Sequence, residues 1–261
     1  MNAVHSLPSS TRRWPALQRA EWGFLIAAIV LLALAVWGPH LPASAHQHNF
    51  ADQRGWWGLP CALDVLSNLP FAVAGVWGLV WLRRLGALRL CLATRATAAL
   101  FFVGLVVTTA GSSWYHWQPQ DAGLLWDRLG MSVAFAGLLG LAAVGRISPR
   151  AGLATTLGLL VAAPAAVLVW AHTGNLLPWA VVQIGGMLVV LVLACLPHRH
   201  GALVLQLGAV IVWYAAAKAM ELADHAVYAA TAGWVSGHTL KHLRAAGAAL
   251  PVLFAMARLH H

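Results

Sequence analysis

The chain has 261 residues, of which 61% are hydrophobic and 9% are charged. Soluble globular domains carry about 25% charged residues, so this composition excludes an ordinary soluble protein and indicates an integral membrane protein. The formal net charge of +9 does not indicate a nucleic-acid-binding protein, because the basic residues form no clustered binding patch.

Apolar segments follow one another along the whole chain, each near the length needed to cross about 30 Å of hydrocarbon. Long apolar runs favour a helical bundle over a β-barrel, whose strands would show ten-residue segments of alternating hydropathy. The sequence therefore predicts an all-α integral membrane protein with almost no room for a soluble domain. The eight predicted spans are 22–38, 65–82, 97–115, 129–145, 151–171, 179–196, 202–220 and 243–257.

The basic residues are distributed by side if the N-terminus is cytoplasmic. Eleven of the sixteen Lys and Arg residues then fall in inner segments and five in outer segments, which is the positive-inside pattern. We therefore expect both termini to be cytoplasmic. The acidic residues fall on the other side, with Glu21 as the single exception.

The first apolar segment allows two interpretations. Arg12 and Arg13 precede it and Ala43-Ser44-Ala45 follows it, which is the pattern of a cleavable signal peptide. We favour a retained helix, because the small-residue triplet lies several residues beyond the apolar core. Cleavage would leave seven helices with the same orientation.

Ionisable side chains at membrane depth are informative, because removing them from water is costly. Ser112 and His116 are four residues apart near the outer end of the third span and share one helix face. Asp127 begins the fourth span, while His238 and His242, again four apart, begin the eighth. The predicted topology places all five residues at the same outer depth.

Three imidazoles with one open coordination position match a catalytic zinc site, and a nearby carboxylate could act as general base. A histidine pair alone is a weak signal, because the chain has 13 histidines and histidine near lipid headgroups is ordinary. The convergence of three separate helices favours a metal site over solvated helix ends.

A second polar cluster lies at the outer end of the seventh span. The spacing of Lys218 and Glu221 predicts an ion pair within one helix. Glu221 or Asp224 could instead orient a zinc-binding histidine, although we favour the structural role. Lys241, between the two histidines of the last span, is expected to face lipid headgroups.

The order SxxxH, then Asp, then HxxxH resembles the alkaline ceramidase family, within the superfamily that also holds adiponectin and progestin receptors and hemolysin-III-like proteins. The resemblance covers roughly residues 50–257 and implies a seven-helix domain at 49–261. Residues 1–48 would then form an N-terminal tail, an extra transmembrane helix and an outer loop. The segments similar to the bacterial ceramidase-like branch are ADQR (51–54), DVLSNLPF (64–71), AKAMELAD (217–224) and SGHTLKHL (236–243).

The resemblance also implies an activity, which is hydrolysis of the amide bond of a ceramide-like N-acyl lipid to a fatty acid and a free amino-lipid (sphingoid base). It implies a bacterial inner membrane, with the active site near the periplasmic leaflet. The implied roles are zinc binding by His116, His238 and His242, general base and proton donor for Asp127, and hydrogen bonding to the reacting oxygen for Ser112.

One feature departs from the animal members of the family, which have an acidic calcium-binding segment before the first core helix. Here that region offers only Asp52 and Asp64, separated by Arg54 and two tryptophans. Calcium takes six to eight oxygen ligands, so a calcium site is under-supplied. This departure also weakens the inference that ceramide itself is the substrate.

Two other functions stay open. A receptor or sensor of the same superfamily would keep the zinc site with little or no turnover. A haem-binding electron carrier would need histidine pairs facing each other at two depths, whereas the membrane-embedded histidines are expected only at the outer side.

Overall fold

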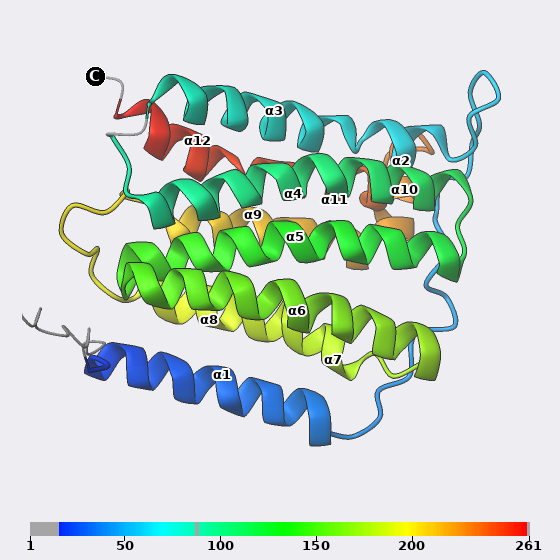
Figure 1. Cartoon of the computed structure of the whole chain (residues 1–261). Helices are drawn as coiled ribbons and strands as arrows, with labels where there is room; N and C mark the ends of the chain where they lie inside the picture. Colours follow the sequence, from blue (N-terminus) through cyan, green and yellow to red (C-terminus); the bar gives the residue numbers. More distant parts are fainter. Residues whose placement is uncertain (1–15, 87–88, 260–261) are drawn as a thin grey trace, which may run out of the picture.

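The computed structural model describes residues 16–86 and 89–259, which are all-helical and contain no β-strand. Successive long helices run in alternate directions along one bundle (Figure 1). The elements are α1 (Arg19–Trp37), α2 (Ala62–Leu66), α3 (Leu69–Arg84), α4 (Leu92–Trp117), α5 (Asp121–Arg146), α6 (Pro149–Thr173), α7 (Leu177–Ala180), the π-helix η1 (Val181–Gly185), α8 (Gly186–Ala194), α9 (Leu207–Leu222), α10 (Asp224–Ala230), α11 (Gly237–Gly247) and α12 (Leu250–Ala257).

Six helical segments of the described chain are long and apolar enough to cross a membrane. This finding supports the predicted helical membrane protein, but it does not reproduce the predicted count of seven spans plus one. The seventh predicted span is shorter in the structure, and the eighth is divided into two helices. Residues 203–206 are not helical, so α9 has 16 residues, and the final segment is split into α11 and α12, with Pro251 in the first turn of α12.

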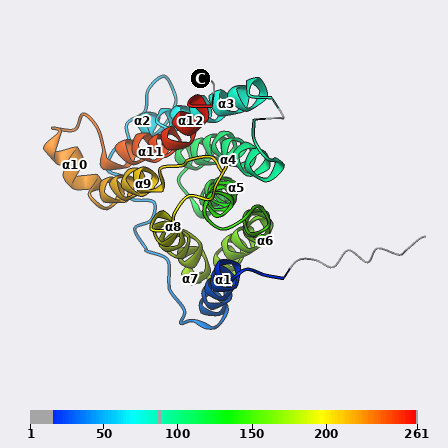
Figure 2. The same cartoon turned by 90° about the vertical axis from the view of Figure 1, so that its left-hand side faces the viewer.

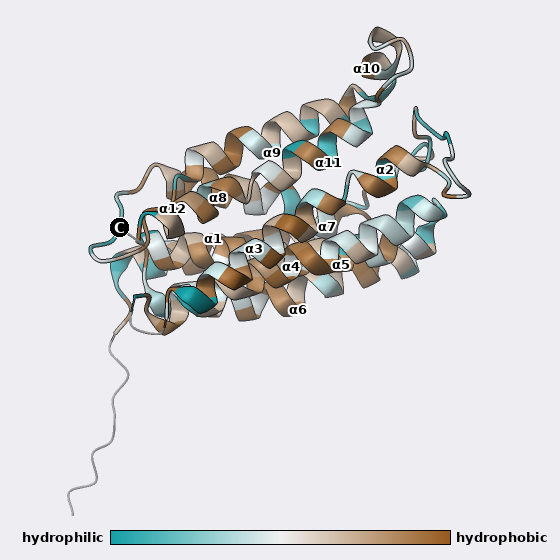
Figure 3. Cartoon of the chain, turned by 90° about the horizontal axis from the view of Figure 1, so that it is seen from above, coloured by the Kyte–Doolittle hydropathy of each residue, from teal (hydrophilic) through white to brown (hydrophobic). Residues whose placement is uncertain are grey.

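Helix α5 lies at the centre of the bundle and packs against α4, α6 and α8 (Figure 2). Helix α9 packs mainly against α11, while α1 lies at the periphery and contacts α7 and η1. Hydrophobic residues dominate the helices, and hydrophilic stretches lie toward the helix ends and in α11 (Figure 3). Three of the polar residues of α11, His238, Thr239 and His242, are buried.

Glycines allow the backbones of α4 and α5 to touch. A Cβ atom added to Gly104 would lie 2.3 Å from the backbone nitrogen of Ala134, and one added to Gly137 would lie 2.2 Å from that of Phe101. Small residues at such contacts are typical of membrane helices, where close approach supplies van der Waals packing. This packing fixes α4 and α5, which carry Ser112, His116 and Asp127.

We expect Gly137→Ala to destabilise the protein by about 1–3 kcal/mol, because the new methyl group must push α5 away from α4. The effect is measured as a lower unfolding temperature in detergent. Gly158→Ala in α6 is the matched control, since an added Cβ there meets nothing within 4 Å. The control should be neutral or stabilise by up to about 1 kcal/mol, because alanine favours a helix. Equal stability of the two variants would contradict the close packing.

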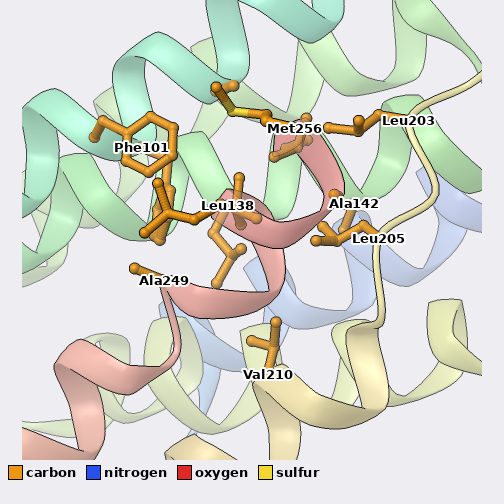
Figure 4. Close-up of a cluster of buried hydrophobic side chains, with 14 of the residues drawn as sticks. Phe101, Leu138, Ala142, Leu203, Leu205, Val210, Ala249 and Met256 are labelled. Atoms are coloured by element: carbon orange, nitrogen blue, oxygen red, sulfur yellow. The ribbon is translucent and has the colours of Figure 1, made fainter. Parts of the chain in front are cut away.

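Buried apolar side chains from α4, α5, α9 and α12, together with the segment 203–205, converge in one core (Figure 4). Phe101, Leu138, Val210 and Met256 are among its members. Between membrane helices such packing stabilises mainly through van der Waals contacts, because lipid tails are as apolar as the side chains. In this protein the core also joins the divided last segment, α11–α12, to the long helices.

Helix α1 is attached to the turn between α5 and α6 by a buried carboxylate. Oε1 of Glu21 accepts hydrogen bonds of 2.6 Å from Oγ of Ser148 and from Nε of Arg150, whose Nη2 also pairs with Glu21. The start of α1 and the end of α12 lie at the same end of the bundle (Figure 1). The connections from α1 to α2, α4 to α5, α6 to α7 and α9 to α11, which the predicted topology places on the outer side, gather at the opposite end (Figure 1). Arg12 and Arg13 lie outside the described residues.

Candidate metal centre

The first turn of α11 is held in place by three local features. Oγ of Ser236 caps the helix by accepting from the backbone N–H of Thr239 at 2.9 Å. Oδ1 of Asp224 accepts from the backbone N–H of His238 at 2.7 Å. Gly237 has no side chain to collide with α9, where an added Cβ would lie 2.3 Å from the carbonyl oxygen of Met220. These contacts fix the position from which His238 and His242 project.

His116 from α4 and His238 and His242 from α11 meet inside the bundle. Their ring nitrogens lie within 4.8 Å of one another, and all three side chains are buried. Nε2 of His116 lies 3.3 Å from Nε2 of His238. Among the described residues, these three form the one group of histidine, cysteine or acidic side chains placed to hold a metal ion. The predicted convergence is confirmed for the three histidines.

One nitrogen pair of the histidine cluster has the separation expected for a tetrahedral metal ion, although the three candidate ligand nitrogens together span up to 4.8 Å. With metal–nitrogen bonds of about 2.0–2.1 Å, two ligand nitrogens of a tetrahedral zinc lie about 3.3–3.4 Å apart. The measured separation of the His116 and His238 nitrogens is 3.3 Å. In addition, Nε2 of His242 is buried and has no hydrogen-bond partner. A buried nitrogen without a partner is costly unless a ligand satisfies it, so these residues fit a bound metal.

Comparisons with known proteins do not identify the chain. Neither protein-family models nor curated proteins match this sequence. We therefore infer the function from the residues themselves and from the geometry that brings them together.

Asp127 and Ser112 lie beside the histidine cluster, as predicted. Both side chains are buried, and both line the same cavity as His242. The Ser112 hydroxyl lies near the Asp127 carboxylate. Asp127 lies in the second turn of α5, inside the end of the helix, and its side chain lines the cavity within the bundle.

The cavity beside the metal centre has a volume of about 100 Å³ and extends into the apolar interior. Its walls come from α3, α4, α5, η1, α8, α9 and α11. Besides Ser112, Asp127 and His242, four polar side chains lie among the apolar lining: Thr108, Gln183, Tyr214 and Lys241. The Tyr214 hydroxyl is buried without a hydrogen-bond partner. The centre thus faces a mostly apolar space with a few polar groups, which is the usual character of a small-molecule site.

Phe50 covers part of the centre, a contact that no sequence pattern indicated. Its ring centroid lies 4.8 Å from that of His116 and 4.5 Å from that of His238. The adjoining loop is fixed by a 2.9 Å hydrogen bond from the backbone N–H of Ala51 to Oδ2 of Asp224. Asp224 therefore joins the loop to α11 through two backbone contacts, and it positions His238 through the backbone and not through the imidazole.

The prediction that Lys241 faces lipid headgroups is wrong. Its Nζ lies 3.3 Å from Nε2 of His238 and 3.2 Å from Oε1 of Glu221, and its side chain is 18% exposed. Lys241 follows His238 by three residues, so both lie on the same helix face. The predicted pair of Lys218 and Glu221 is confirmed at 2.5 Å. Glu221 therefore joins two lysines beside the centre, a contact between α9 and α11 that spacing alone could not reveal.

The two acidic residues considered for calcium are engaged by other groups. Nε and Nη2 of Arg54 donate to the two carboxylate oxygens of Asp52 at 2.8 and 2.7 Å. Burial raises the pKa of the Asp52 carboxyl, but the hydrogen bonds and charge of Arg54 outweigh burial and hold this pKa below its ordinary value. Oδ1 of Asp64 accepts from Oγ1 of Thr239 at 2.6 Å. Both Asp52 oxygens are thus paired with Arg54, whereas Oδ2 of Asp64 is buried without a hydrogen-bond partner, so these two residues supply few of the six to eight oxygens that calcium takes.

Proposed function

We propose that the protein is a zinc-dependent intramembrane hydrolase that cleaves the amide bond of a ceramide-like N-acyl lipid. The observation that supports the proposal is a buried cluster of three histidines beside a buried carboxylate and hydroxyl, at the end of an apolar cavity. We further propose membership of the bacterial ceramidase-like branch. Helices α9 and α11–α12 would then complete a seven-helix domain after α1, in an inner membrane with both termini cytoplasmic and the centre near the periplasmic leaflet.

His116, His238 and His242 would hold the zinc ion through Nε2. Zinc bound there would supply Lewis-acid activation of a water molecule and of the amide carbonyl. Asp127 would accept the proton of the attacking water and later return it to the nitrogen of the leaving amine. The Ser112 hydroxyl, which lies beside Asp127, would donate a hydrogen bond to the oxygen on which negative charge develops.

The cavity supports a lipid substrate because its lining is mostly apolar. At about 100 Å³ it is smaller than the roughly 300–1,000 Å³ of typical ligand pockets, so an acyl chain must displace lining side chains on entry. Entry from the membrane would bring such a chain to the centre without crossing water. Lys241 lies beside His238, where its charge would attract the carboxylate of the fatty-acid product.

The proposal is tested with the purified full-length protein in detergent. We expect colourless protein with one zinc per chain by elemental analysis, and release of fatty acid from at least one member of a panel of N-acyl lipids. A chelator should abolish the release. Zinc-loaded protein that releases no fatty acid from any lipid would contradict the hydrolase and favour a receptor or sensor. A haem absorption spectrum would contradict the zinc centre.

A further inference from the structure

Ser67 connects the metal centre to the break between α2 and α3. Its side chain is buried, and its Oγ lies 2.7 Å from Nδ1 of His242, a residue 175 positions later in the chain. The same Oγ donates a 3.0 Å hydrogen bond to the backbone carbonyl of Asp64. That carbonyl also accepts from Nδ2 of Asn68 at 2.9 Å. The serine therefore lies in a fixed chain of hydrogen bonds that ends on a ring of the histidine cluster.

The direction of these hydrogen bonds determines which nitrogen of His242 carries a proton. A serine hydroxyl has one hydrogen, and here it is directed to the Asp64 carbonyl, which can only accept. Oγ must therefore accept from His242, so Nδ1 carries the hydrogen. A neutral imidazole has one protonated nitrogen, which leaves the lone pair on Nε2. That nitrogen is buried, without a hydrogen-bond partner, and belongs to the histidine cluster.

We infer that Ser67 is a positioning residue that holds His242 in the tautomer and ring orientation required to bind the metal ion. This inference rests on the metal centre proposed above, but it does not depend on amide hydrolysis. Without this hydrogen bond the neutral ring could carry its hydrogen on Nε2, and a protonated Nε2 cannot bind a metal ion. His116 offers a contrast, because its Nδ1 is buried without a partner. The support given to His242 is thus a specific feature of its surroundings.

The test compares the zinc affinity of matched variants of the full-length protein in detergent, with a competing chelator. Loss of an outer hydrogen bond to a ligand typically costs 10–100-fold in metal affinity, so we expect this loss for Ser67→Ala. Ser67→Thr and Ser67→Val form an isosteric pair in which only threonine keeps the hydroxyl. The threonine variant should bind zinc at least about 10-fold more tightly than the valine variant, and any packing cost of the extra methyl group is common to both.

Ser113→Ala is the control, because the Ser113 hydroxyl donates to the backbone carbonyl of Val65 at 3.4 Å and is not hydrogen-bonded to a ligand histidine. Its zinc affinity should equal that of the wild type. The unfolding temperature of the metal-free variants shows whether Ser67 stabilises the fold, and the zinc affinity shows whether it positions His242. If Ser67→Ala lowers that temperature but keeps the wild-type zinc affinity, or if the threonine and valine variants bind equally, the role of Ser67 is overturned. A wild type that binds no zinc would overturn the metal centre and this inference together.

Discussion

Asp127→Asn is expected to reduce lipid amide hydrolysis by about 10²–10⁴-fold while leaving zinc bound, since this is the usual contribution of general acid–base catalysis. Asparagine has nearly the same shape as aspartate, so the substitution opens no cavity at this buried position. It removes the carboxylate that, in the proposed mechanism, accepts the proton of the attacking water. The measurement is the rate of fatty-acid release at saturating lipid, together with the zinc content of the same sample.

Asp121→Asn is the matched control on the same helix. The Asp121 side chain is 70% exposed and accepts hydrogen bonds from the outer loop, including one of 2.6 Å from Nε2 of Gln47. Exposed substitutions away from a site change stability by less than about 0.5 kcal/mol, so this variant should keep wild-type activity. If Asp127→Asn hydrolyses lipid as fast as Asp121→Asn, Asp127 does not transfer the proton.

His238→Ala is expected to abolish zinc binding, because it removes one of the three nitrogens that the fold brings together. The loss should exceed the 10–100-fold effect typical of outer-shell changes. It should also remove the stabilisation that bound zinc gives to the folded state, about 4 kcal/mol at a free zinc concentration 1,000 times the Kd. A chelator should therefore lower the unfolding temperature of the wild type but not that of the variant.

His172→Ala is the control for this second prediction. His172 is exposed near the end of α6 and is not a member of the histidine cluster. Zinc content and the response to chelator should both match those of the wild type. Full zinc retention by His238→Ala would show that the metal, if present, is bound elsewhere.

The amino-acid sequence predicted the class of protein and most of the candidate site. Apolar runs indicated helices at eight places, and the described chain has helix within each of them, although only six segments are long and apolar enough to cross a membrane. Alternating direction along a bundle then brought the helix ends bearing His116, Asp127 and His238 to the same end (Figure 1). Hydropathy and helical spacing are local properties, so they can be read from neighbouring residues. The depth of each polar residue follows from them once the topology is known.

Hydropathy did not predict the lengths of the last helices correctly. The apolar segment at 202–220 includes residues 203–206, which are not helical, and the segment at 243–257 is divided near Pro251. Both stretches are apolar in any conformation, so composition does not distinguish a helix from a buried extended segment. Packing of Leu203, Leu205 and Met256 in the core decides their structure.

The surroundings of the histidines were decided only by the tertiary structure. Ser67 contacts His242 across 175 positions, Lys241 meets Glu221 from another helix, and Phe50 packs on His116 from a loop. Each contact depends on how two helices, or a helix and a loop, are rotated and shifted against each other. That rotation is set by the summed packing of many side chains, including the glycine contacts of α4 and α5, and not by the spacing of any motif. The sequence alone therefore determined which residues could bind a metal, while the packing of the bundle determined what surrounds and orients them.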